Sequence, residues 1–368
     1  MLDDTILKNI LIVRLDNLGD VIMTAPVFKI IKEQTGAKIT LLTSSQAASI
    51  APLLDAVDDI IVSDMPWLKN TSPFADRFSL FEKVVQKIKN KKFDSCFIFS
   101  VYSQSILPTA LIPWLADIPV VAGYSRENPY QLLSHWVIDK EPFKIIRHQL
   151  ERDLFFLRQL GFDTQKALLP ELKNPKNNPD NLAFTKPLNA YLVLHPGVSE
   201  EKREYPTHFW EKLIDLLLSE SKYDLVLTGD TKDAVKFDFL FQKSRKRIRN
   251  RMGKSDIYDL CRTINNAAGM ISVNTGPAHI GMCYDTPIIV LYAETNPQHA
   301  PWSRFSKALY YSVPHNMQSR NFIIQHVHQY YYSEEYKKPP SAQEILSELE
   351  QVIKAKTEYF TSPSVFKK

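Results

Sequence analysis

The sequence predicts an α/β protein of two domains, each built on a parallel sheet with helices on both faces. Short continuous apolar runs, typical of buried strands, alternate with amphipathic stretches at helical spacing. This alternation occurs twice along the 368 residues, once on each side of a Pro- and Asn-rich stretch. The length is ordinary for two domains, and a hydrophobic content of 44% allows each to bury a core.

The first series opens with an apolar strand at Ile10–Val13 and a helix that runs to Gly36. The elements expected after it are a strand at Lys38–Thr43, a helix at Ser45–Leu54, a strand at Ile60–Val62, a helix at Phe81–Lys89, strands at Cys96–Phe99 and Val120–Gly123, and an amphipathic helix at Ile145–Leu160. We therefore expect an N-terminal Rossmann-like domain over residues 1–162. Residues 163–189, rich in Pro and Asn, are the predicted linker.

The second series opens with the apolar strand Tyr191–His195. The elements expected after it are a helix at Phe209–Glu220, a strand at Tyr223–Leu227, a helix at Lys232–Gln242, a short strand at Ile248, a helix at Ile257–Ile264, a strand, turn and helix over 267–284, and a strand at Ile288–Tyr292. The pattern weakens after Pro301 and ends in a helix at Ser341–Lys354. We expect a second Rossmann-like domain over residues 190–340, followed by a C-terminal helix and tail over 341–368.

The composition narrows the class of protein. A net charge of +4 suits an anionic substrate or a membrane surface and is too small to indicate nucleic-acid binding. The three cysteines, Cys96, Cys261 and Cys283, have no metal-ligand spacing and favour a reducing cytoplasm. The N-terminal residues lack the pattern of a signal peptide, and the longest apolar run, 106–118, is shorter than a membrane span.

The stretch Ser272–His279 carries the strongest functional pattern. It follows an apolar strand and leads through Asn274, Thr275, Gly276 and Pro277 into a helix. Pro277 suits a first helical position, where a missing N–H costs nothing. Such a turn directs free backbone N–H groups towards one point, which favours a phosphate.

A second candidate lies at the end of the first strand, in Asp16-Asn17-Leu18-Gly19-Asp20. Ligands of open α/β sheets bind at the carboxyl ends of strands, so Asp20 could act as a general base for a substrate hydroxyl. An N-terminal capping role explains the same residue equally simply. Asp16 is a weaker candidate base by the same reasoning. The loop lacks the Gly-x-Gly-x-x-Gly pattern of dinucleotide binding.

Three more loops follow strands of the second series. The first contains His195, Gly197, Ser199, Lys202 and Arg203, and its cations could neutralise a diphosphate. A solvated charged loop would look the same. The other loops contain Thr228-Gly229-Asp230 and Thr295-Asn296-Pro297. Because all of these follow strands of one sheet, we expect them to converge with Ser272–His279 on a nucleotide site.

Four segments in this order resemble glycosyltransferase family 9, the heptosyltransferase family of lipopolysaccharide core assembly. The segments are Ile12–Pro26, Arg147–Arg152, His195–Gly197 with Arg203–Pro206, and Ser272–His279. The resemblance covers roughly residues 8–302. Two positions depart from the family pattern: Asn274 stands where the family usually has Asp, and Tyr205 where it has Trp. The amide of Asn274 keeps hydrogen bonding and loses the charge.

The resemblance implies a GT-B fold, with two Rossmann-like domains facing across a cleft, and an inverting transfer that needs no metal and no cofactor. In this family the donor is commonly ADP-heptose and the acceptor is a saccharide on a lipid. By position, Asp20 matches the catalytic base and Arg203 the phosphate-binding lysine. Thr275, Gly276 and His279 match the diphosphate-binding turn.

We therefore predict an inverting glycosyltransferase of the cytoplasm. Its expected donor site comprises Gly197, Ser199, Arg203, Gly229, Asn274, Thr275, Gly276 and His279, and its expected acceptor site comprises Asp16, Asn17 and Gly19. The lysine-rich helix that contains Lys83 and Lys87 would contact the cytoplasmic face of the inner membrane peripherally, although such helices are usually only solvated. The alternatives are a non-catalytic homologue that binds nucleotide sugars and a GT-B enzyme with another nucleotide sugar.

Overall fold

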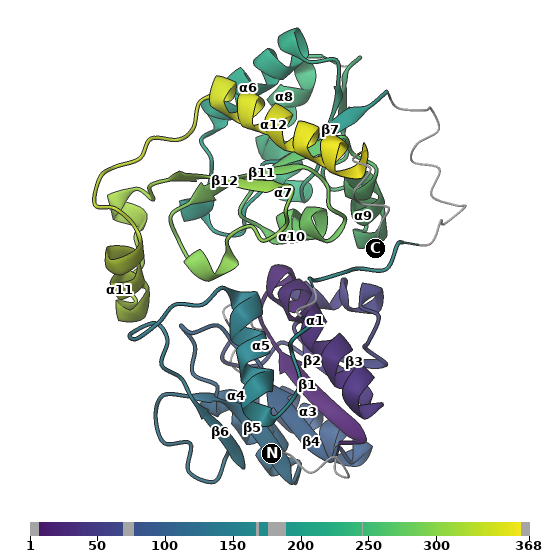
Figure 1. Ribbon diagram of the computed structural model, residues 1–368, viewed down its shortest axis with the longest axis vertical. Coiled ribbons are helices and arrows are strands. Elements are labelled where there is room, and N and C mark those ends of the chain that lie inside the picture. The colour runs from purple at the N-terminus through teal and green to yellow at the C-terminus, as the bar shows by residue number, and fades with distance from the viewer. Residues whose placement is uncertain (1–6, 69–76, 167–168, 176–188, 245, 362–368) are drawn as a thin grey trace. The chain divides into compact units, whose positions relative to one another are not determined.

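The computed structural model describes residues 7–68, 77–166, 169–175, 189–244 and 246–361. Much of the predicted linker, 176–188, lies outside these residues, as do the last seven residues, 362–368, of the predicted C-terminal helix and tail over 341–368. The chain divides into two compact units, Met1–Lys173 and Asn174–Lys368 (Figure 1). Residues 169–173 belong to the first unit, where the Lys173 backbone N–H donates to the Leu53 carbonyl at 2.9 Å.

Unit 1 contains one sheet of six parallel strands in the order β3-β2-β1-β4-β5-β6. Its strands are β1 (Asn9–Arg14), β2 (Lys38–Thr43), β3 (Asp59–Val62), β4 (Ser95–Ile98), β5 (Val120–Ser125) and β6 (His135–Ile138). Its helices are α1 (Leu18–Thr35), α2 (Ser45–Ala48), η2 (Ala51–Leu53), α3 (Arg77–Lys91), α4 (Leu107–Leu115) and α5 (Gln149–Leu160).

The helices of unit 1 cover both faces of the sheet. Tyr124 of β5 packs on Phe156 of α5, with 5.2 Å between ring centroids. The next residue back along β5, Gly123, faces the other way, where a Cβ would meet Ile106 at the start of α4. Because side chains alternate along a strand, α4 and α5 lie on opposite faces. The apolar core on the α4 face also includes buried residues of α3.

Unit 2 repeats this topology, with the strand order β12-β11-β10-β7-β8-β9 and every pair parallel. Its strands are β7 (Tyr191–His195), β8 (Asp224–Leu227), β9 (Ile248–Asn250), β10 (Gly269–Val273), β11 (Ile288–Ala293) and β12 (Ser306–Tyr311). Its helices are η4 (Glu201–Arg203), α6 (Thr207–Glu220), α7 (Thr231–Lys236), α8 (Asp238–Gln242), α9 (Ile257–Asn265), α10 (Gly276–Cys283), η5 (Pro297–His299), η6 (His315–Met317), α11 (Phe322–Tyr331) and α12 (Ala342–Thr361).

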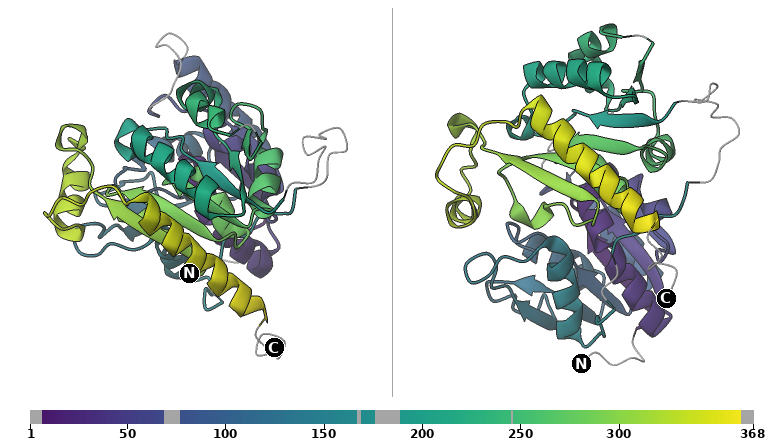
Figure 2. Two further views of the ribbon diagram at one scale, coloured as in Figure 1. Left: turned by 90° about the horizontal axis from the view of Figure 1, so that it is seen from above. Right: turned by 45° about the horizontal axis from the view of Figure 1, so that its top comes forward.

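The long helix α12 lies across the sheet of unit 2 beside α6 (Figure 2). Gly269 of β10 has no side chain, which lets Leu349 and Ile353 of α12 approach the strand closely. On the opposite face, Gly281 of α10 allows close contact with Met270 of β10. Both sheets therefore carry helices on both faces, which agrees with the predicted α/β class.

Several elements differ from the sequence prediction. The expected helix at Ser45–Leu54 is broken into α2 and η2, and the one at Lys232–Gln242 into α7 and α8. The sequence pattern did not indicate α4, β6, β12 or α11. Two prolines obscured α4, but Pro108 lies in its first turn, where the missing N–H is tolerated. Helix α5 begins after His148, whose side chain accepts from the Leu150 N–H at 3.3 Å, rather than at Ile145.

Candidate active site

The carboxyl end of β1 carries a buried cation between acids. Arg14, the last residue of β1, is fully buried. Its Nε lies 3.2 Å from an oxygen of Asp16, and its Nη2 lies 3.4 Å from an oxygen of Asp20. Burial alone would lower the pKa of the guanidinium, but Asp16, Asp153 and Asp20 hold it above its ordinary value. Arg14 therefore stays charged and draws both loop carboxylates together.

Asp20 lies in the first turn of α1 and is almost fully buried. Its second carboxylate oxygen accepts from the Asn17 backbone N–H at 3.1 Å. This is the capping role that the sequence offered as the alternative explanation, and it holds Asp20 in one orientation. The backbone carbonyl of Asp20 accepts from the Thr24 hydroxyl at 2.9 Å, so the turn is fixed from both sides. Gly19 precedes Asp20 in the same buried turn.

Helix α5 packs against α1 and supports this corner with a buried acid, Asp153. Its carboxylate accepts from the Thr24 hydroxyl at 2.8 Å and from the Gln149 amide at 2.7 Å. Burial raises the pKa of Asp153, and Arg14 opposes that rise. Asp153 thus links α5 to the first turns of α1.

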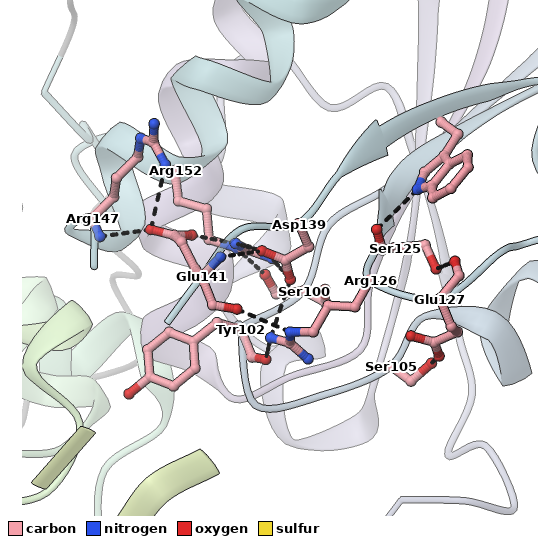
Figure 3. Close-up of polar contacts among 11 residues, drawn as sticks. Ser100, Tyr102, Ser105, Ser125, Arg126, Glu127, Asp139, Glu141, Arg147 and Arg152 are labelled. Carbon is pink, nitrogen blue, oxygen red and sulfur yellow. Dashed lines mark hydrogen bonds and ion pairs between the residues drawn. The ribbon is translucent and has the colours of Figure 1, made fainter. Parts of the chain in front are cut away.

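Arg152, the neighbour of Asp153, is the centre of a second buried charge cluster (Figure 3). Its guanidinium forms two bonds to Asp139, at 2.9 and 3.0 Å, and a further ion pair with Glu141. It also lies 4.1 Å from the ring centroid of Tyr124. Arg126 joins the cluster at 3.2 Å from Asp139. The sequence segment Arg147–Arg152 resembled the family, but only the fold reveals that its last arginine is a buried structural partner of Asp139 and Glu141.

In unit 2, the first strand ends in a buried histidine. The Nδ1 atom of His195 lies 3.0 Å from the Thr228 hydroxyl at the end of the neighbouring strand β8. Burial lowers the pKa of His195 to about 4, although Asp230 opposes this shift. His195 is therefore neutral at pH 7. The corresponding end of β1 carries the permanent charge of Arg14.

Gly197 and Gly229 lie in the loops after β7 and β8, and one acid lies against both. A Cβ on Gly197 would come within 2.0 Å of the Asp233 carboxylate, and one on Gly229 within 2.6 Å. The same carboxylate accepts from the Asp230 N–H at 2.8 Å. Burial raises its pKa, with a contribution from Asp230. Asp233 was missed in the sequence because nothing in the α7 pattern distinguishes it; the two preceding glycines were the available signal.

Arg203 ends the short helix η4 in the loop after β7. Its guanidinium lies 3.0 Å from a carboxylate oxygen of Glu200, and its backbone carbonyl accepts from the Tyr311 hydroxyl at 3.0 Å. The backbone is thus anchored to β12 while the charged side chain is partly exposed. Ser199 lies in the same loop. The neighbouring Lys202 also faces Glu200, at 3.5 Å.

The turn between β10 and α10 has the predicted strand-turn-helix form. Helix α10 begins at Gly276 after Thr275, whose side chain does not cap it. Pro277 is the second helical residue, one later than predicted, and its missing N–H is still tolerated there. Asn274 and His279 are buried, and the Trp302 indole N–H donates to Nδ1 of His279 at 3.2 Å. That bond assigns the acceptor role to Nδ1 and leaves the proton on Nε2.

Strand pairing brings these loops together within unit 2. His195 pairs with Ser272, and Leu194 pairs with Leu227, so the loops after β7, β8 and β10 leave one edge of the sheet side by side. Strand order reverses between β7 and β10, which is where ligands bind in such sheets. The donor residues expected from the sequence lie in these three loops, except Gly276 and His279, which lie in α10 directly after the third loop. The residues expected to bind the acceptor, Asp16, Asn17 and Gly19, lie at the equivalent edge of unit 1.

A sequence model of glycosyltransferase family 9 (heptosyltransferase) matches residues 81–331. The chain belongs to this family. It is 21% identical over 300 residues to lipopolysaccharide heptosyltransferase 2 of Salmonella typhimurium, covering 77% of this chain and 82% of that protein. It is 22% identical over 292 residues to lipopolysaccharide heptosyltransferase 1 of Pseudomonas aeruginosa, covering 78% and 79%. The chain is accordingly a glycosyltransferase of the heptosyltransferase family.

Solved structures of the family share the fold. The glycosyltransferase family 9 protein of Veillonella parvula has a TM-score of 0.73 at 18% identity, covering 95% of this chain and 97% of that one. The ADP-heptose lipopolysaccharide heptosyltransferase II of Escherichia coli has a TM-score of 0.71 at 17% identity, covering 95% and 99%. With the two six-stranded parallel sheets, these likenesses confirm the predicted GT-B class. Among the helices in the described part of the chain, none is both long and apolar enough to cross a bilayer.

Proposed function

We propose that this member of family 9 transfers heptose from ADP-heptose to a saccharide of the lipopolysaccharide core, with inversion and without a metal, in the cytoplasm. The observation that carries the proposal is the convergence of the β7, β8 and β10 loops around an uncapped helix start at Thr275–Gly276. The donor is suggested by relatives: one is named for ADP-heptose, and the heptosyltransferase WaaC of Escherichia coli, with a TM-score of 0.64 at 18% identity over 88% of this chain and 98% of that one, was solved with ADP.

The donor diphosphate would bind in unit 2 at the carboxyl ends of β7, β8 and β10. At the start of α10, Pro277 has no N–H and the Ala278 N–H donates to the Thr275 carbonyl at 3.0 Å. The Gly276 N–H is therefore the donor offered to a ligand, and the positive end of the helix dipole favours an anion there. Arg203 would form charge-assisted bonds to the phosphates in place of its bond to Glu200. The neutral His195 adds no charge to this edge. The donor contacts expected of Gly197, Ser199, Gly229, Asn274 and His279 belong to the same proposal.

The acceptor would bind at the carboxyl end of β1, in contact with Asp16, Asn17 and Gly19. Asp20 would take the proton of the acceptor hydroxyl as that oxygen forms a bond to the anomeric carbon. The bond from the anomeric carbon to the diphosphate breaks on the opposite face, which inverts the centre. Negative charge builds on the departing diphosphate, where Arg203 and the Gly276 N–H at the start of α10 would stabilise it. Asn17 and Arg14 hold the Asp20 carboxylate in place for this step.

Asp20→Asn tests the general base. It retains the size of the side chain, so we expect the transfer rate to fall about 10²–10⁴-fold while ADP affinity, measured by calorimetry, stays unchanged. The matched control is Asp153→Asn, which removes another buried acid near Arg14 and should reduce stability with a much smaller effect on the transfer rate. Transfer by Asp20→Asn at the wild-type rate would refute this assignment.

A second candidate function is a non-catalytic nucleotide-sugar-binding homologue, and the observation that favours it is the neutral, buried Asn274 in place of the family's usual Asp. A thermal-shift series with ADP, UDP, GDP and CMP derivatives tests the donor, because a ligand stabilises the state that binds it. Stabilisation by ADP derivatives alone would favour heptose transfer. A preference for UDP or GDP would indicate another sugar, and tight binding with neither transfer nor donor hydrolysis would favour the non-catalytic homologue.

A further inference from the structure

Unit 1 exposes apolar side chains on its edge strand β6. Trp136 and Ile138 are 43% and 58% exposed. They alternate along β6 and so share one face of the sheet. Trp136 pairs with Gly123, and a Cβ on Gly123 would point towards Ile106 at the start of α4. Both exposed side chains therefore lie on the α4 side of the sheet, and Figure 1 shows α4, β5 and β6 close together in unit 1.

Helix α4 is apolar on its outer surface as well as its inner one. Ala110 and Ile112 are buried in the core of this face. On the outside, Leu111, Trp114 and Leu115 are exposed, with Trp114 at 50%. A surface helix of a globular protein ordinarily has a polar outer side, so these residues require another explanation. We call the five exposed residues Leu111, Trp114, Leu115, Trp136 and Ile138 the α4–β6 face.

The helix packed against α4 is strongly basic. The segment 77–92, which contains α3, has six Lys and Arg residues and one acid, Glu82. Lys89 of α3 forms an ion pair at 2.6 Å with Asp117, just after the end of α4, which fixes the two helices side by side. Lys83, Lys87 and Lys92 are exposed. A band of cations therefore borders the α4–β6 face.

We propose that the α4–β6 face docks onto an anionic lipid bilayer, with its tryptophans and leucines in the interfacial region and the α3 lysines against the headgroups. Tryptophan favours the boundary between headgroups and acyl chains, and apolar burial combined with lysine attraction is what holds peripheral proteins on membranes. A second copy of the chain fits less well, because two-fold pairing through this face would bring two basic α3 helices together. The choice of a bilayer also rests on the proposed lipid-linked acceptor.

Co-sedimentation of the full chain with vesicles tests the proposal. We expect binding to vesicles of phosphatidylcholine with phosphatidylglycerol, weaker binding to phosphatidylcholine alone, and weakening by salt. The double variant Trp114→Ser, Leu115→Ser should lower the binding constant about tenfold, because two apolar side chains no longer enter the bilayer. Lys83→Gln with Lys87→Gln should lower binding to the anionic vesicles only. Phe322→Ser, which removes a 69% exposed aromatic residue in unit 2, is the matched control and should bind like the wild type.

Two further measurements separate this inference from the proposed function. Circular dichroism and ADP affinity should be unchanged in the Trp114, Leu115 variant, and transfer to a water-soluble saccharide should proceed at the wild-type rate while transfer to a vesicle-embedded acceptor falls. Vesicle binding that survives the double substitution would overturn the proposal. So would a dimer, seen by light scattering, that the double substitution abolishes without any vesicle binding. If the wild-type protein transferred sugar to neither acceptor, that result would count against the proposed function alone.

Discussion

The two sheets have the same strand order, yet the first strand of one ends in a charged side chain and the first strand of the other in a neutral one. Strand β1 ends in Arg14, which lies between Asp16 and Asp20 and stays charged. Strand β7 ends in His195, which lies beside the Thr228 hydroxyl and is neutral at pH 7 because burial lowers its pKa. Shared topology thus fixes where a ligand can bind, and the few side chains at the strand ends decide which charge is acceptable there.

The helices α1 and α10 also differ in whether an acidic side chain lies at their N-terminal ends. The first turn of α1 contains an acid of its own, Asp20, whose carboxylate accepts from the N–H of the residue before the helix, Asn17. The side chain of Thr275 does not cap α10. The start of α1 therefore presents a fixed carboxylate, which is suited to accept a proton. The start of α10 has no acidic side chain of its own and is suited to bind an anion.

The largest expected effect is a loss of stability at acidic pH that is caused by protonation of His195. The unfolded chain takes up a proton on this histidine near pH 6.5, and the folded chain takes it up only near pH 4. Between these values the unfolded state binds more protons, so the contribution of His195 to stability is complete above pH 6.5 and is lost as the pH falls towards 4. The loss amounts to about 3 kcal/mol. Urea unfolding of the wild type and of His195→Gln across this range measures it.

The control for this experiment is His208→Gln, because His208 is exposed at the start of α6. It should keep the wild-type dependence of stability on pH, whereas His195→Gln should flatten it. If all three proteins lose stability in parallel as the pH falls, the acids of unit 1 rather than His195 determine the pH dependence of stability. The neutral state of His195 would then contribute no measurable stability.

The next effect concerns the cation proposed for the donor. Arg203→Ala should weaken ADP binding by about 1.5–3 kcal/mol, the usual contribution of a hydrogen bond to a charged group. Lys202→Ala is the matched control, since Lys202 lies in the same short helix and faces the same Glu200. Calorimetric titration with ADP should show a clear loss for the first variant and a small one for the second. Equal losses would mean that the loop attracts the nucleotide by charge alone.

The smallest effect comes from giving α10 a carboxylate at its start, as α1 has. Thr275→Asp should cap the helix and raise the free energy of unfolding by up to about 1 kcal/mol. The same charge should repel the diphosphate and weaken ADP binding about tenfold. Thr275→Asn, which can cap without a charge, serves as the control and should keep more of the affinity. Unchanged binding by the Asp variant would show that the nucleotide lies elsewhere.

Much of the fold could be predicted because its central strands are continuous apolar runs. Tyr191–His195 and Lys38–Thr43 match β7 and β2 at both ends. The elements that were missed have weaker patterns for physical reasons. Strand β6 exposes Trp136 and Ile138 at a sheet edge, and α4 contains two prolines and is apolar on both sides. Neither shows the contrast between inner and outer side chains on which periodicity depends.

The candidate site also contains residues that the sequence could predict and residues that it could not. Loops after strands could be identified along the chain because they combine small polar or basic residues, in most cases with a glycine. Asp233 could not, since its position against Gly197 and Gly229 depends on how the start of α7 packs beside two loops. The buried cluster of Arg152, Asp139 and Glu141 joins the segment after β6 to α5, and no spacing in the sequence links them.

The sequence by itself determined the family, the class of fold and the loops that follow the strands, because these depend on local runs and short motifs. Tertiary structure decided the charge at each corner. Arg14 remains charged because the fold gathers three acids around it, and His195 remains neutral because the fold buries it beside a hydroxyl. Burial and the distances between charges are set by packing between distant segments, and no single segment of the chain contains that information.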